Sequence, residues 1–188
     1  MEAVATDLPE VLLIRPKIFH DGRGHFLEVY QRLRYSGSGV SQEFVQDNLS
    51  FSHRNVLRGL HYQLGHPQDK LIVVLSGLIL DVVADIRRGS PRFGRATAVT
   101  LSSEDYAQLY VPKGFAHGFC VLSETATVLY KCSDYYSPSE ERGIRWDCPD
   151  LSIDWPVGRP TVSEKDMALP FLKDIPPEDL PTFSPSVS

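Results

Sequence analysis

The chain has 188 residues, of which 42% are hydrophobic and 23% charged, values that suit one globular domain with a sizeable core. Its formal net charge of −5 argues against general nucleic-acid binding, and no apolar run approaches the roughly 20 residues of a membrane-spanning helix. The N-terminus has no signal-peptide pattern, and Cys120, Cys132 and Cys148 lack CxxC spacing, so we expect reduced thiols in a cytoplasmic protein.

Short strand-like segments separated by turn signals follow one another along most of the chain. We expect strands over residues 11–19, 25–30, 44–51, 56–63, 71–75, 78–86, 96–101, 108–111, 116–122 and 125–132. Ser76-Gly77 is a two-residue connection of the kind that joins the strands of a hairpin. About ten short strands at this spacing predict an all-β sandwich or barrel.

Helical signals are few. Residues 32–36 and 103–107 are candidate turns, and Ser163 is a candidate N-cap for a short helix over 164–169. The tail from Ile175 holds four prolines, so we expect it to be extended or partly disordered. Without an internal repeat or linker, the chain is predicted to be one domain over 1–188, with a short N-terminal extension and this tail.

Two histidines stand in apolar, strand-like segments. A lone histidine such as His61 is more often a neutral, satisfied residue than a catalytic one. However, the pattern Pro112-x-Gly114-x-x-His117-Gly118-Phe119 resembles the second motif of the cupin superfamily. The matching first segment offers His61 alone, whereas a zinc or iron site generally needs three protein ligands. The sequence therefore predicts no metal, and without a GxGxxG or Walker pattern it predicts no organic cofactor.

An ordered set of further motifs makes the resemblance specific. The motifs are Asp21-x-Arg23-Gly24-x-Phe26-x-Glu28, Phe44-Val45-Gln46-Asp47-Asn48, Leu57-Arg58-Gly59-Leu60-His61-Tyr62-Gln63, Lys70-Leu71, Asp81-Val82-Val83-Ala84-Asp85-Ile86-Arg87, Val128-Leu129-Tyr130-Lys131-Cys132, Asp134-Tyr135-Tyr136, Glu141-Arg142-Gly143-Ile144-Arg145-Trp146 and Ser163-Glu164-Lys165-Asp166. Over roughly residues 11 to 172 the chain resembles the dTDP-4-dehydrorhamnose 3,5-epimerase family. The resemblance implies a cupin-type jelly-roll barrel, a homodimer that exchanges strands, a dTDP-sugar substrate and no metal.

The implied reaction inverts C3 and C5 of dTDP-4-keto-6-deoxy-D-glucose, in dTDP-L-rhamnose biosynthesis. The C4 ketone acidifies the hydrogens on both carbons, so an enzyme needs a base on one face and an acid on the other. The resemblance assigns His61 as the base, Asp166 as its partner, Tyr130 as the acid and Lys70 as the group that stabilises the oxyanion on O4. Each has a plain structural alternative: Asp166 a helix N-terminal carboxylate, Tyr130 a core residue and Lys70 a solvated strand-edge charge.

The remaining candidates would bind the substrate. Arginine binds phosphate in a bidentate manner, so Arg23 and Arg58 are expected at the diphosphate, with added charge from Lys165. Amide and aromatic side chains would contact the base, ribose or sugar. These expected contacts come from Gln46, Asn48, Phe26 and Tyr136, while Glu28 and His117 are further candidates. The resemblance implies that Arg23, Phe26 and Glu28 act from the partner subunit. As a structural alternative, Arg23 is a turn residue between two glycines, and His117 is a structural histidine.

Three functions remain open on the sequence. The first is the 3,5-epimerase. The second is an epimerase acting on one carbon, or a ketoisomerase, on a related dTDP-4-keto sugar. The third is a non-catalytic sugar-binding cupin, which the retention of every proposed acid/base residue disfavours.

Overall fold

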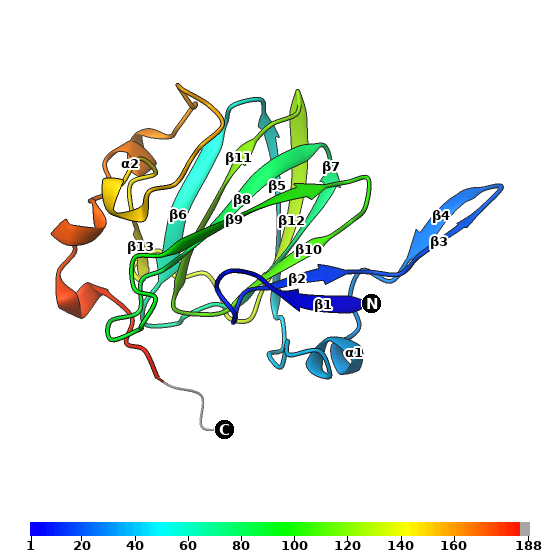
Figure 1. Ribbon diagram of the computed structural model, residues 1–188, viewed down its shortest axis with the longest axis horizontal. Helices are drawn as coiled ribbons and strands as arrows, with labels where there is room; N and C mark the ends of the chain where they lie inside the picture. Colours follow the sequence, from blue (N-terminus) through cyan, green and yellow to red (C-terminus); the bar gives the residue numbers. More distant parts are fainter. Residues whose placement is uncertain (185–188) are drawn as a thin grey trace.

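The computed structural model describes residues 1–184, which form thirteen strands and a few short helices (Figure 1). One sheet has the strand order β1–β2–β10–β7–β12–β5, and these strands are Glu2–Ala5, Leu12–Arg15, Gln108–Val111, Lys70–Ser76, Thr125–Cys132 and Gln46–His53. The second has the order β13–β6–β11–β8–β9, and its strands are Glu141–Gly143, Leu57–Gln63, Phe115–Val121, Leu78–Asp85 and Ala96–Ser102. The predicted all-β jelly roll is confirmed.

Smaller elements surround the two sheets. The hairpin of β3 (Ile18–Asp21) and β4 (Gly24–Leu27) projects from the body (Figure 1). Helix α1 (Arg32–Ser36) follows it, and α2 (Glu164–Met167) lies near β6. Three 3₁₀ turns cover Pro149–Leu151, Leu172–Asp174 and Pro177–Asp179. Ser163 caps α2 as predicted, because its side chain accepts a hydrogen bond from the Asp166 N–H.

Three clusters of buried apolar residues hold the elements in place, and two of them pack against the five-stranded sheet. The first fills the space between the two sheets and includes Ile72, Val83, Leu109 and Phe119, each at most 5% exposed. Full burial of such a side chain stabilises the fold by roughly 1.5–3 kcal/mol relative to exposure. The second core covers the other face of the five-stranded sheet, where the C-terminal segment packs. The five-stranded sheet is therefore buried on both faces, and this fixes the strands that carry the histidines.

The predicted hairpin at Ser76-Gly77 is wrong. Strand β7 pairs with β10 and β12, whereas β8 pairs with β9 and β11, so the chain crosses from one sheet to the other at Gly77. Gly77 has a φ of +91°, and a Cβ there would overlap the carbonyl oxygen of Thr125. A corner between sheets and a hairpin turn both favour glycine here, because both need a positive φ. Only the long-range strand pairing shows which of the two structures forms.

From Ile175 to Ser184 the proline-rich tail is ordered, which differs from the expectation of partial disorder. Ile175 and Leu180 are buried in the second core, at 8% and 7% exposure. Thr182 forms a bridge with Arg88, and the Phe183 N–H donates to the Arg88 carbonyl at 2.9 Å. The prolines keep the backbone extended, but apolar burial fixes its path. The last four residues of the predicted tail lie outside the described residues.

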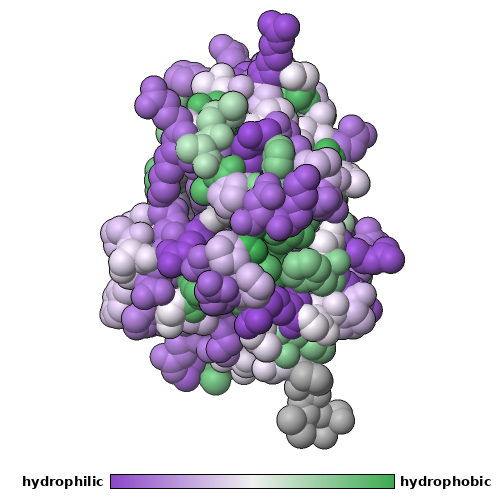
Figure 2. Space-filling model, turned by 90° about the vertical axis from the view of Figure 1, so that its left-hand side faces the viewer, coloured by the Kyte–Doolittle hydropathy of each residue, from purple (hydrophilic) through white to green (hydrophobic). Residues whose placement is uncertain are grey.

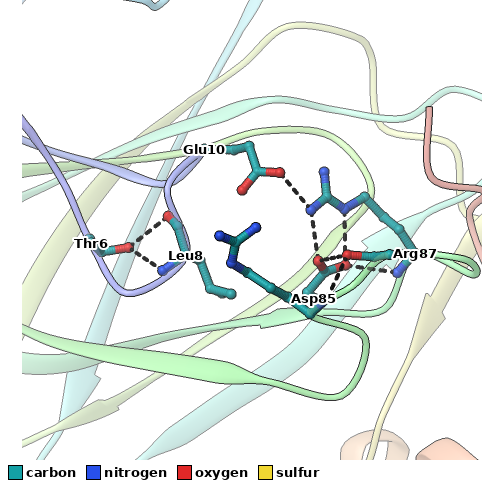
Figure 3. A network of polar contacts seen from close by, with 7 residues as sticks. Thr6, Leu8, Glu10, Asp85 and Arg87 are labelled. Atoms are coloured by element: carbon teal, nitrogen blue, oxygen red, sulfur yellow. Dashed lines mark hydrogen bonds and ion pairs between the residues drawn. The ribbon is translucent and has the colours of Figure 1, made fainter. Parts of the chain in front are cut away.

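A polar network ties the chain's beginning to the end of β8 (Figure 3). The Arg87 guanidinium donates to both carboxylate oxygens of Asp85, at 2.9 and 2.7 Å, and to Glu10 at 3.0 Å. Burial alone would raise the pKa of Asp85, but the hydrogen bonds from Arg87 and Ser90 hold it below its ordinary value. The Arg87 guanidinium also lies 4.1 Å from the Phe115 ring centroid. This network is structural, since none of its members lines the cavity that contains His61.

Candidate active site

A cavity of about 630 Å³ is lined by residues of both sheets and of the α2 segment. All four predicted catalytic residues line it: His61, Asp166, Tyr130 and Lys70. Six of the predicted substrate-binding residues line it as well, namely Gln46, Asn48, Arg58, His117, Tyr136 and Lys165. The fold thus brings together side chains from separate motifs across the whole chain.

His61 and Asp166 form a hydrogen-bonded pair. His61 Nε2 lies 2.9 Å from Asp166 Oδ1, and the second carboxylate oxygen accepts the Gly59 N–H at 3.1 Å. Burial would raise the pKa of Asp166, but the hydrogen bond and charge of His61 and the Gly59 N–H lower it below the ordinary value. An ionised Asp166 accepts only, so Nε2 carries the proton and the lone pair on Nδ1 is free to act as a base.

A second histidine–carboxylate pair lies beside the first. His117 on β11 is the register partner of His61 on β6, and its Nε2 is 2.8 Å from Asp81 Oδ1. Asp81 is fully buried, and its Oδ2 has no hydrogen-bond partner among residues 1–184. The sequence reasoning gave Asp81 no role, although a quoted motif begins with it; the available signal was a carboxylate inside the apolar run of β8.

Tyr130 and Lys70 approach the cavity from the six-stranded sheet. Burial raises the pKa of Tyr130, so its hydroxyl stays protonated near neutral pH and can donate a proton. Burial lowers the pKa of Lys70, while Cys132, Glu141 and Asp81 oppose that shift by favouring the ammonium. Strand β7 lies between β10 and β12, so the alternative of a strand-edge charge is wrong for Lys70.

The side chains of alternate residues on β5 form a polar row in the cavity. The Gln46 amide donates to Asn48 Oδ1 at 3.0 Å, and its oxygen accepts the Tyr136 N–H at 3.0 Å. Farther along β5, the Ser52 hydroxyl, which is buried and does not line the cavity, accepts from Arg58 Nε at 3.1 Å. These β5 residues hold a cation and an aromatic ring in place without neutralising the cation, which suits an anionic ligand with a planar base.

Glu141 is a cavity residue to which the sequence reasoning gave no role. It lies on β13, forms an ion pair with Lys165 and accepts from the Tyr136 hydroxyl at 2.7 Å. Burial would raise its pKa, but the bonds from Lys165 and Tyr136 hold it below the ordinary value. Glu141 therefore fixes two predicted substrate-binding residues at once. The only available signal was its place in a quoted motif.

Three predicted substrate-binding residues lie outside this cavity. Arg23 and Phe26 belong to the projecting β3–β4 hairpin, where Arg23 pairs with Asp21 at 2.6 Å and Phe26 is 71% exposed. Glu28 follows the hairpin and pairs with Arg34 at 3.2 Å. Within one chain, Arg23 is therefore what the structural alternative predicted: a turn residue between two glycines.

Residues 1–184 contain no cluster of three or more histidine, cysteine, aspartate or glutamate side chains arranged to hold a metal ion. Over the same residues, no helix is long and apolar enough to cross a membrane.

Comparison with known proteins places this site in context. Residues 5–174 match a family model described as dTDP-4-dehydrorhamnose 3,5-epimerase. A relative of that description from Neisseria gonorrhoeae is 46% identical over 169 residues, which are 89% of this chain and 52% of the relative. The chain thus spans about half the length of that relative.

Two solved structures carry bound sugar nucleotides. A dTDP-6-deoxy-D-glucose-3,5-epimerase from Legionella pneumophila, in complex with dTDP-4-keto-L-rhamnose, has a TM-score of 0.95 and 48% identity over 97% of this chain and 98% of its own. A 3′-monoepimerase from Streptomyces bikiniensis, in complex with dTDP-quinovose, has a TM-score of 0.87 and 33% identity over 95% of this chain and 92% of its own.

Proposed function

Because this chain belongs to the dTDP-4-dehydrorhamnose 3,5-epimerase family, we propose that it inverts C3 and C5 of dTDP-4-keto-6-deoxy-D-glucose to give dTDP-4-keto-L-rhamnose, for dTDP-L-rhamnose biosynthesis. The observation that carries the proposal is the arrangement of acid and base groups. His61 lies on the five-stranded sheet with Asp166 of α2 beside it, Tyr130 and Lys70 lie on the six-stranded sheet, and all four line one cavity. A ring bound there would have a base and an acid available to it from separate elements.

In the first step His61 removes a proton. The C–H bond next to the ketone breaks, its electrons form an enolate with negative charge on O4, and the proton passes to Nδ1 of His61. Asp166 stabilises the imidazolium through its hydrogen bond with Nε2. Lys70 stabilises the oxyanion, a task in which one lost donor typically costs roughly 3–4 kcal/mol. The developing charge would also favour the ammonium form of Lys70, which burial opposes.

In the second step Tyr130 donates a proton to the opposite face of the same carbon. The O–H bond of the phenol breaks, a C–H bond of inverted configuration forms, and the ketone returns. A phenol is a weak acid, but an enolate is a strong enough base to take its proton. Arg58 lowers the pKa of Tyr130, in opposition to burial, and so eases the release of the proton. Solvent exchange would restore both groups before the second carbon reacts.

The nucleotide would occupy the wider part of the cavity. Arg58 and Lys165 supply positive charge for the diphosphate, and the half-exposed Tyr136 ring offers a surface on which a thymine could stack. Gln46 and Asn48 present amide groups for the base or ribose. His117 faces the cavity with its tautomer set by Asp81, as a hydrogen-bond partner for the sugar.

A homodimer would explain the residues that lie outside the cavity. The hairpin presents Phe19 and Phe26 to solvent, and the outer face of the six-stranded sheet exposes Leu49, Phe51 and Leu75. Exposed apolar surface on this scale is typical of an interaction site. In the proposed dimer the hairpin reaches the partner's cavity. The buried, unpaired thiols support a cytoplasmic location, where thiols stay reduced.

The deciding experiment is incubation with dTDP-4-keto-6-deoxy-D-glucose in D₂O, followed by NMR of deuterium at C3 and C5. We expect deuterium at both carbons together with inverted product, and activity that survives prolonged chelation. Deuterium at one carbon would instead indicate a monoepimerase, as in the Streptomyces bikiniensis protein, and no deuterium would indicate a binding protein. His61→Ala serves as the control, since it removes the base and should abolish uptake at both positions.

A further inference from the structure

The C-terminal strap, residues 175–184, lies beyond the stretch of residues 5–174 that the family model matches. It runs over the outer face of the five-stranded sheet, on the side of the molecule that carries α2 (Figure 1). On this side hydrophilic side chains surround smaller hydrophobic patches (Figure 2). Leu180 of the strap is buried in the same core as Leu60 and Tyr62 of β6. The strap is therefore part of the packed structure behind the site.

One residue of the strap holds two neighbouring strands. The Tyr62 hydroxyl on β6 donates to the main-chain carbonyl of Asp179 at 2.8 Å, and Arg142 Nε on β13 donates to Asp179 Oδ1 at 3.1 Å. Tyr62 and Arg142 are register partners in the β6–β13 ladder. Asp179 thus bridges a cross-strand pair from the outer face of the sheet. The Tyr62 half of the bridge is buried, since Tyr62 is only 4% exposed, whereas the ion pair of Asp179 with Arg142 is partly exposed.

The next residues along these strands face the cavity. His61 precedes Tyr62, Glu141 precedes Arg142, and successive side chains of a strand point to opposite faces. Strand β13 has only three residues and lies at the edge of the sheet. Backbone hydrogen bonds of Glu140 with Leu64 and of Ile144 with Leu60 continue its pairing with β6 by one residue at each end. The placement of Glu141, and through it of Lys165 and Tyr136, depends on how firmly β13 is fastened to β6.

We propose that Asp179 is a positioning residue of the site: it fastens β13 to β6 from behind and thereby holds Glu141 in the cavity for substrate binding. The consequence for binding rests on the proposed function, whereas the fastening of the strand does not. A loss at Asp179 should weaken substrate binding more than the chemical step, because the proton-transfer groups sit on β6, β12 and α2, outside β13.

The first test measures the strand directly. Hydrogen exchange of the amides over residues 141–144 is compared in the wild type, in Asp179→Ala, and in Thr182→Ala. Thr182 is the matched control, since its hydroxyl accepts from Arg88 Nη2 at 3.2 Å and this strap contact does not involve β6 or β13. Loss of a partly exposed ion pair should speed exchange about two- to fivefold in Asp179→Ala. Equal exchange in the two variants would overturn the proposal.

The second test measures the effect on substrate binding, as KM, and on turnover, as kcat. Asp179→Ala should raise KM for the dTDP sugar about two- to fivefold while kcat changes less, and Thr182→Ala should change neither. In a Glu141→Gln background the Asp179→Ala change should have no further effect on KM, because its action passes through Glu141. If the effects of Asp179→Ala and Glu141→Gln on KM were additive, Asp179 would not act through Glu141, and the proposal would be overturned. Lack of turnover by the wild type would refute the proposed function, and the exchange comparison would still decide the fastening.

Discussion

Asp166→Asn is the substitution that most directly tests the proposed base. The variant keeps the size of the side chain but replaces one acceptor oxygen with an NH₂ donor. In the wild type, Asp166 accepts from His61 Nε2 at 2.9 Å and from the Gly59 N–H at 3.1 Å. An asparagine has one carbonyl oxygen and cannot accept from both groups at full strength. If that oxygen stays on the Gly59 N–H, the NH₂ group faces Nε2.

The consequence for His61 follows from its two tautomers. Nε2 must accept from the NH₂ group, so the ring proton moves to Nδ1, the nitrogen that would remove the substrate proton. The imidazolium also loses the facing negative charge. A wrong tautomer of this kind lowers kcat by about 10⁴-fold in the serine protease triad, which corresponds to roughly 5.4 kcal/mol. We expect a loss of about 10³- to 10⁴-fold here, with KM changed far less.

The assay is solvent deuterium uptake at C3 and C5, measured with saturating dTDP-4-keto-6-deoxy-D-glucose. Uptake reports proton removal even when no inverted product accumulates. Ser163→Ala is a useful comparison, since it removes the cap of α2 while the carboxylate is retained. A loss of less than tenfold in Asp166→Asn would mean that the carboxylate does not set the tautomer of His61, and Asp166 would be removed from the mechanism.

The same variant predicts a pH dependence of stability. The pKa of Asp166 in the folded protein is below its ordinary value of about 3.9, so its stabilising effect is fully present above that value and is lost as the pH falls through the folded-state pKa. A hydrogen bond to a charged group contributes about 1.5–3 kcal/mol. The wild type should therefore exceed Asp166→Asn in unfolding free energy near pH 7, and urea titrations below about pH 4 should show the difference shrinking.

Three further outcomes are expected. Tyr130→Phe should still exchange deuterium with retention while inversion falls about 10²- to 10⁴-fold; an unchanged ratio of uptake to product would assign the second proton to another group. Mixing Arg23→Ala with His61→Ala subunits should restore about one site in two per heterodimer, and no recovery would contradict a shared site. Asp85→Asn should lower the unfolding free energy by about 1.5–3 kcal/mol in urea, since the Arg87 guanidinium loses one of its two carboxylate partners and keeps Glu10.

Local patterns predicted most strands, because apolar alternation and turn residues act within a few positions. They failed where distant pairing decides. Gly77 meets the requirements of a hairpin turn and of a corner between sheets alike, and only the partners of β7 and β8 distinguish them. Strands β1 and β13 are short edge strands without a periodic pattern of their own. They form because β2 and β6 offer them a ladder.

In the site, too, the sequence indicated the types of residue but not which of them lie together. His61 and His117 were found from the unusual position of a titratable ring in an apolar strand, yet no local rule pairs His61 with Asp166, 105 positions later. That pairing was available only from the family resemblance. Asp81 and Glu141 stood in quoted motifs but were given no role, because a carboxylate has many structural uses. Their roles depend on which strand lies opposite, and that is a property of the fold.

The projecting hairpin connects the association of the chain with its chemistry. A β-hairpin of four-residue strands with exposed Phe19 and Phe26 gains little from standing alone in water. Burial of each ring against another surface would contribute roughly 1.5–3 kcal/mol. Arg23 lies at the tip of this same hairpin, where it pairs with the exposed Asp21, and a bound diphosphate would compete with that carboxylate for its guanidinium. In the proposed dimer the apolar rings would supply the affinity and Arg23 the charge, so that a complete binding site would form only when the subunits associate.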